Sequence, residues 1–319
     1  MRGRIWLRRL LFGGFVLALL AIVGATWFTH RLMTEMLTGR AFRQNTAIAV
    51  SDPMQPGYRG DPMQAFDLPF ENLTVDTPLG PAPAWWVPGK PGAGSPRRAA
   101  LFIHGIGGAR EDGYQYLPEL HAAGLPVLLV TYRNDAGAPA APDGLRSFGL
   151  TEWSDIDAAF ALLHNRGIDD VVLVAASMGG GIAGQFLARS DYFDMADALI
   201  LDAPALDFPA ILRHVTAELR LPLGGIGAAL AVPAFGLSHG ANLSQARVGD
   251  ILADFAGPVL VLHGRRDRIV PPASSLALLA ARQGKTTLLL TPGDHLQSRS
   301  TAPRRFETVL QDFLATLPK

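Results

Sequence analysis

The feature that most constrains this chain is an apolar run over 171–176 that ends at Ser177 and continues at once into glycines. Such a run is typical of a parallel strand buried on both faces. The serine then lies in a sharp strand-to-helix turn, where the residues two before and two after it must be small. Ala175 and Gly179 occupy those positions, so Ser177 is the candidate nucleophile.

A nucleophilic serine needs a base and an acid, and candidates for both lie downstream. An imidazole must take the hydroxyl proton, and a carboxylate must orient that imidazole. In this arrangement each group follows a further strand. Asp267, after a strand over 258–262, is the expected acid, and His295, after a strand over 286–290, is the expected base. Asp202, at the end of an earlier strand, is a rival for the acid.

A glycine-rich loop earlier in the chain offers an oxyanion hole. A strand ends there in His-Gly-Ile-Gly-Gly over 104–108. One backbone N–H would come from Met178, the residue after the nucleophile, and the other from Ile106 in the loop. His104 and His263 each precede a glycine at a strand end, where an imidazole typically bonds the loop backbone. We therefore expect structural roles for these two histidines.

In four motifs the chain resembles serine hydrolases of the α/β-hydrolase fold, over about residues 68–319. It is most similar to the esterase, lipase and serine-aminopeptidase-like branch, which includes membrane-anchored members. Alanine at position 175 departs from the glycine that this family usually has there. The four motifs lie at 104–108, 175–179, 263–271 and 293–295.

The resemblance implies an enzyme that cleaves carboxylic esters, with lipophilic or short acyl groups, through an acyl-enzyme. Ser177 would attack, His295 would shuttle the proton and Asp267 would orient the imidazole. One alternative is an amidase or serine peptidase, because the same triad cleaves amides once the leaving amine is protonated. The other is a catalytically silent binding protein with this fold.

The amino terminus carries a second strong signal. Arginines at positions 2, 4, 8 and 9 precede an uncharged run over 10–28, which spans about 28 Å as a helix at about 1.5 Å per residue. The positive flank favours the cytoplasmic side, so a single-pass membrane anchor would place the catalytic domain outside the cytoplasm. A cleaved signal peptide, with small residues at 23–25, is the alternative.

The remaining sequence predicts one catalytic domain behind a linker. Residues 1–30 form the expected anchor, 31–67 a stalk rich in proline and glycine, and 68–319 the hydrolase domain. Within this domain two edge strands precede strands that alternate with helices, which predicts a doubly wound, mostly parallel sheet. Residues 205–254 interrupt the alternation as a cap insertion, either a mobile lid or a helical hairpin packed on the core.

Composition limits the partners. Twenty-eight basic and 28 acidic residues give a formal net charge of zero, so nucleic acid is not an expected partner. The chain has no cysteine, and its eight histidines lack ligand spacing, so we expect neither a metal site nor a cofactor. The expected partners are a small acyl ester as substrate and membrane lipid around the N-terminal helix.

Overall fold

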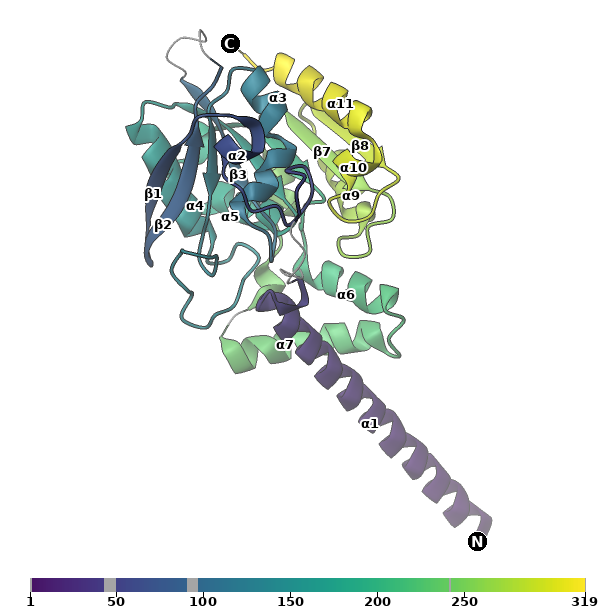
Figure 1. Ribbon diagram of the computed structural model, residues 1–319. Coiled ribbons are helices and arrows are strands. Elements are labelled where there is room, and N and C mark those ends of the chain that lie inside the picture. The colour runs from purple at the N-terminus through teal and green to yellow at the C-terminus, as the bar shows by residue number, and fades with distance from the viewer. Residues whose placement is uncertain (1, 43–49, 91–96, 241, 319) are drawn as a thin grey trace.

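The computed structural model describes residues 2–42, 50–90, 97–240 and 242–318 and contains an eight-stranded sheet (Figure 1). The strand order is β1-β2-β4-β3-β5-β6-β7-β8, and every neighbouring pair is parallel except β1 with β2 and β2 with β4. This confirms the doubly wound, mostly parallel sheet. The strands are β1 (Glu71–Thr77), β2 (Gly80–Val87), β3 (Arg98–Ile103), β4 (Val127–Val130), β5 (Asp170–Ala176), β6 (Ala196–Asp202), β7 (Val259–Gly264) and β8 (Thr286–Thr291).

Helices cover both faces of the sheet. Alternate residues of β3 point to opposite sides, with Leu101 in one hydrophobic cluster and Phe102 in the other, because side chains alternate along a strand. The cluster of Leu101 includes helices α4 (Trp153–Asn165), α5 (Met178–Arg189), α8 (Gly249–Asp254) and α9 (Pro272–Ala281). The cluster of Phe102 includes η2 (Arg110–Gln115), α3 (Leu117–Ala122) and α11 (Pro303–Ala315), with α10 (Ser298–Thr301) and α2 (Pro62–Phe66) nearby.

The insertion between β6 and β7 is a helical hairpin. Helix α6 (Phe208–Glu218) is followed by α7 (Gly224–His239) and by a short turn, η4 (Leu243–Gln245), before α8. Figure 1 shows α6 and α7 one below the other at the foot of the domain, beneath the sheet. The expected cap insertion is thus built of two consecutive helices.

The N-terminal helix α1 (Arg2–Leu37) projects from the foot of the domain, as Figure 1 shows. It ends seven residues beyond the expected anchor, at Leu37 rather than at residue 30. Its last turns place Met33, Met36 and Leu37 in the hydrophobic core, and a 3-10 turn, η1 (Arg40–Phe42), follows. The start of the expected stalk, from residue 31 to Leu37, is therefore packed into the domain, because burying these apolar side chains removes them from water.

Candidate active site

Ser177 lies at the sharp turn between β5 and α5. Its backbone has φ 53° and ψ −118°, a conformation that costs about 1–3 kcal/mol for a residue with a side chain. A Cβ atom at position 179 would lie 2.3 Å from the carbonyl oxygen of Ile103, so glycine is required there. Ala175, by contrast, is accommodated as a buried residue of β5. The departure from the usual family pattern therefore leaves the turn intact.

His295 follows β8 and reaches the serine. Its Nε2 lies 2.9 Å from Ser177 Oγ, and its Nδ1 lies 2.7 Å from Asp267 Oδ2. With the Nδ1 proton donated to the carboxylate, Nε2 is free to accept the hydroxyl proton of the serine. The backbone N–H of His295 donates to Asp294 Oδ1, which also accepts from the backbone N–H of Arg268. Asp294 thus joins the base loop to the acid loop.

Asp267 is held by hydrogen bonds on both oxygens. Its Oδ1 accepts the backbone N–H groups of Ile269 and Val270, each at 2.8 Å. Its Oδ2 faces His295 and, at 3.1 Å, Nε2 of His263. Burial raises the pKa of Asp267, but the hydrogen bonds from the two histidines and the backbone outweigh it and hold the pKa well below its usual range. The carboxylate is therefore ionised next to the imidazole.

The rival acid, Asp202, has other partners. Its Oδ2 accepts the Tyr116 hydroxyl at 2.9 Å, and its Oδ1 accepts the Ser298 hydroxyl at 3.1 Å. Burial raises its pKa to about 6, partly offset by the hydrogen bond from Tyr116. The Nδ1 atom of His295 is bonded to Asp267 instead. The geometry thus favours Asp267 as the acid.

The glycine-rich loop after β3 lies directly against the nucleophile. A Cβ atom at position 105 would lie 2.9 Å from Ser177 Cβ, and Ile106 lines the same pocket as Ser177. Met178 is the first residue of α5, where backbone N–H groups have no partner within the helix. Both expected oxyanion donors therefore belong to segments that meet at Ser177. Asp112 supports the loop by accepting the backbone N–H of Ala109.

His104 and His263 both have buried structural contacts, as their positions at strand ends suggest. His104 Nε2 lies 2.8 Å from Asp135 Oδ2, and its Nδ1 lies 2.8 Å from the Gly105 carbonyl. His263 Nδ1 lies 2.7 Å from Ser275 Oγ, while its Nε2 faces Asp267. His263 thus positions the candidate acid, a contact that the sequence analysis missed because it depends on the loop closing back onto β7.

The pocket at Ser177 has a volume of about 160 Å³. Phe42 and Pro56, from the expected stalk, line it together with the oxyanion loop, Ile269 and Leu296. A Cβ atom at Gly107 would lie 2.7 Å from Phe42 Cβ, so this part of the chain packs tightly on the loop. No motif marks Phe42 or Pro56, and the sequence analysis placed both outside the catalytic domain.

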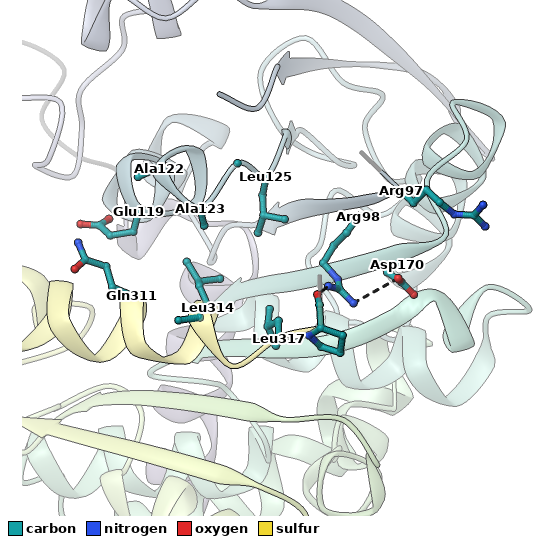
Figure 2. Close-up of a pocket in the computed structure, with 13 residues that line it drawn as sticks. Arg97, Arg98, Glu119, Ala122, Ala123, Leu125, Asp170, Gln311, Leu314 and Leu317 are labelled. Atoms are coloured by element: carbon teal, nitrogen blue, oxygen red, sulfur yellow. Dashed lines mark hydrogen bonds and ion pairs between the residues drawn. The ribbon is translucent and has the colours of Figure 1, made fainter. Parts of the chain in front are cut away.

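A larger cavity, of about 1060 Å³, lies at the opposite end of the strands (Figure 2). Arg98 and Asp170, the first residues of β3 and β5, line it with Leu314 and Leu317 from the C-terminal segment. In Figure 2 the Arg98 guanidinium points to Asp170. It also donates to the carbonyl oxygen of Pro318. Since Ser177 follows the other end of β5, this cavity is separate from the triad.

Comparison with known proteins agrees with this architecture. The sequence matches the model of the alpha/beta hydrolase family over residues 100–309. The uncharacterized protein Rv2307c of Mycobacterium tuberculosis (strain ATCC 25618 / H37Rv) is 26% identical over 217 residues, which cover 66% of this chain and 66% of that relative. YqkD of Bacillus subtilis (strain 168), also uncharacterized, is 22% identical over 219 residues, 67% of this chain and 70% of its own length.

Solved structures share the fold at low identity. The esterase Pf2001 of Pyrococcus furiosus superposes with a TM-score of 0.60 at 15% identity, covering 81% of this chain and 96% of its own. The esterase EaEST of Exiguobacterium antarcticum gives a TM-score of 0.56 at 16% identity, covering 77% and 100%. With a family match that spans well over half of its length, the chain belongs to the alpha/beta hydrolase family.

Proposed function

We propose that this protein is a serine hydrolase that cleaves carboxylic esters through an acyl-enzyme. The observation that carries the proposal is the continuous hydrogen-bonded chain from Ser177 through His295 to Asp267 at a pocket. The fold supports it, because in such sheets reacting groups gather at the carboxyl ends of the strands. The solved esterases with the same fold are consistent with this activity.

In the proposed reaction, Ser177 Oγ attacks the ester carbonyl while His295 Nε2 takes its proton. The backbone N–H groups of Met178 and Ile106 stabilise the oxyanion. The tetrahedral intermediate collapses, and the alcohol leaves with the proton from His295. A water molecule then attacks the acyl-enzyme by the same route and releases the acid. Asp267 stabilises the imidazolium formed in each half-reaction.

The pocket supports a short acyl group. Its volume of about 160 Å³ is below the roughly 300–1,000 Å³ of pockets that enclose a drug-sized ligand. Ile106, Ile269 and Leu296 supply apolar walls.

A substrate panel tests this proposal. Nitrophenyl esters of increasing chain length, with matched anilides, are offered to the enzyme and to Ser177→Ala. We expect the enzyme to hydrolyse short esters and the Ser177→Ala variant to lose this activity. Faster cleavage of the anilides would indicate an amidase, and no turnover of either would indicate a silent protein.

We also propose that α1 anchors the enzyme in a membrane with its catalytic domain outside the cytoplasm. The helix is long and apolar enough to span a bilayer, and large apolar side chains from Ile5 to Phe28 are exposed along it. Arginines cluster at its N-terminal end, which favours the cytoplasmic side. A cleaved signal peptide is disfavoured because the apolar run over 10–28 is longer than the roughly 7–15 residues of a signal-peptide core.

A pair of truncations tests the anchor. Full-length protein should resist alkaline carbonate extraction, and a variant lacking residues 2–22 should be extracted yet remain active, because the buried turns of α1 are retained. A variant lacking residues 2–37 should be destabilised, because it loses the buried Met33, Met36 and Leu37. Extraction of the full-length protein, or a mature N-terminus near Thr26, would contradict the anchor.

A further inference from the structure

The cap helix α7 presents an apolar face that no other part of the described chain covers. Its buried side, with Ala231 and Phe235, faces the domain. Leu223, Ile226, Leu230 and Leu237 are exposed to 42%, 45%, 45% and 91%. Ile226, Leu230 and Leu237 are four and seven residues apart, which puts them on one side of the helix, and Leu223 directly precedes its first residue. We call these four residues the outer face of α7.

Charge is absent from this part of the cap. No Asp, Glu, Lys or Arg occurs over 221–238, and every exposed residue from Leu223 to Leu237 is apolar. A soluble surface helix normally has charged residues on its outward face. A contiguous exposed apolar face of this kind marks an interaction surface.

The contact with α1 fixes where that surface lies. A Cβ atom at Gly227 would lie 2.7 Å from Thr29 Oγ1 and 2.9 Å from the Ala25 carbonyl, so the two helices touch closely. Ala25 is three residues, or about 4.5 Å, from the end of the apolar run at Phe28. Helix α7 therefore meets α1 at the outer end of the segment proposed to cross the bilayer.

The two helices cross rather than run side by side. A second contact joins Ser238 Oγ to His30 Nε2 at 3.3 Å. At 1.5 Å per residue, the two contact points lie about 17 Å apart along α7, from Gly227 to Ser238. Along α1 they lie at most about 8 Å apart, because both fall between Ala25 and His30. Figure 1 shows α7 below α6 at the foot of the domain, where α1 leaves it. With α1 across a bilayer, α7 lies closer to the membrane plane than to its normal.

We propose that the outer face of α7 is immersed in the surface of the bilayer that holds α1. This inference rests on the proposed anchor. A helix that lies in the membrane plane buries its apolar face about 5–10 Å deep, to the boundary between headgroups and acyl chains, which is the level at which α7 touches α1. The cap is in turn bonded to the acid loop, because His214 Nε2 lies 2.8 Å from the Asp267 carbonyl. Docking of α7 thus holds the catalytic pocket at the membrane surface and favours esters carried by the bilayer.

The chain contains no cysteine, so single cysteines report on defined positions in the full-length protein in phosphatidylcholine vesicles. Leu230→Cys and Leu237→Cys probe the outer face of α7, and Leu17→Cys probes α1. Leu276→Cys on α9 is the matched control, since Leu276 is exposed to 46% and Leu230 to 45%. Each cysteine carries a fluorophore whose quenching by aqueous iodide is compared with that by brominated lipid.

We expect brominated lipid to quench the fluorophores at positions 17, 230 and 237 several-fold more than that at 276, and iodide to show the reverse order. Quenching of position 230 by iodide would overturn the proposal, as would its protection from both quenchers, which would indicate a protein partner or a second copy. If position 17 is quenched by lipid and position 230 is not, the anchor stands and the docking of α7 is wrong. If position 17 itself escapes the lipid quencher, the anchor is wrong.

Discussion

Replacing Asp267 by asparagine is a sharp test of the acid, because the structure dictates how the amide must turn. The backbone N–H groups of Ile269 and Val270 both donate to Oδ1 of Asp267, so the asparagine oxygen must remain there. The NH₂ group then occupies the place of Oδ2 and faces His295 Nδ1. The ring must accept from it, which puts the imidazole proton on Nε2, opposite the Ser177 hydroxyl. In that tautomer His295 cannot take the serine proton.

The size of the loss follows from this tautomer. In serine hydrolases an asparagine in place of the triad acid lowers kcat by about 10⁴, which is about 5.5 kcal/mol of transition-state stabilisation at about 1.36 kcal/mol per tenfold. The NH₂ group also replaces the oxygen that faces His263. His263 Nε2 keeps the Val270 carbonyl as an acceptor at 3.1 Å, so we expect a loss of stability below the roughly 1–3 kcal/mol of an unpaired buried donor.

The assay measures kcat for a short nitrophenyl ester, with denaturant unfolding as the check on folding. Asp202→Asn is the matched control, since it makes the same change in a buried carboxylate near the site, and we expect less than about tenfold loss because Asp202 bonds Tyr116 and Ser298 rather than His295. Folded Asp267→Asn with a tenth or more of the normal kcat would refute the reasoning. Inactivation by Asp202→Asn alone would reassign the acid.

Two further predictions concern stability. Burial raises the pKa of Asp202 from 3.8 to about 6, so ionising this carboxyl in the folded protein costs about 3 kcal/mol. The contribution of Asp202 to the free energy of unfolding is therefore fully present below pH 3.8 and is lost as the pH rises through about 6. Unfolding curves of Asp202→Asn should lack this loss, and identical pH profiles for the two proteins would contradict it. Gly179→Ala should destabilise by about 1–3 kcal/mol or more because its Cβ meets the Ile103 carbonyl, whereas Gly225→Ala, with nothing within 4 Å, should be neutral or stabilising in the same measurement. Equal stability of both glycine variants would refute the steric argument.

The sheet and the positions of the candidate triad were predictable because their signals are local. Each buried strand is a short apolar run, and Ser177, Asp267 and His295 each follow such a run at the edge where parallel strands end. Helix α9 was not predicted, because its ten residues after Pro271 lack an amphipathic pattern.

Contacts between distant segments were not predictable from local patterns. The close approach of α1 to Gly227 depends on packing between residues some 200 positions apart. Phe42 and Pro56 line the pocket at Ser177, although their surroundings are rich in proline, glycine and polar residues, as in a linker. Residues such as Phe42 and Pro56 pack on the domain only because the folded domain offers them a surface, and that surface cannot be read from the local sequence.

Covalent labelling of the nucleophile tests the central claim most directly. The full-length enzyme is treated with a fluorophosphonate, digested, and analysed by mass spectrometry to locate the modified residue. We expect the phosphonyl adduct on Ser177, complete loss of ester hydrolysis in proportion to labelling, and no adduct in Ser177→Ala. Ester hydrolysis that persists in fully labelled enzyme, or an adduct on a different serine that accounts for the activity, would contradict the account.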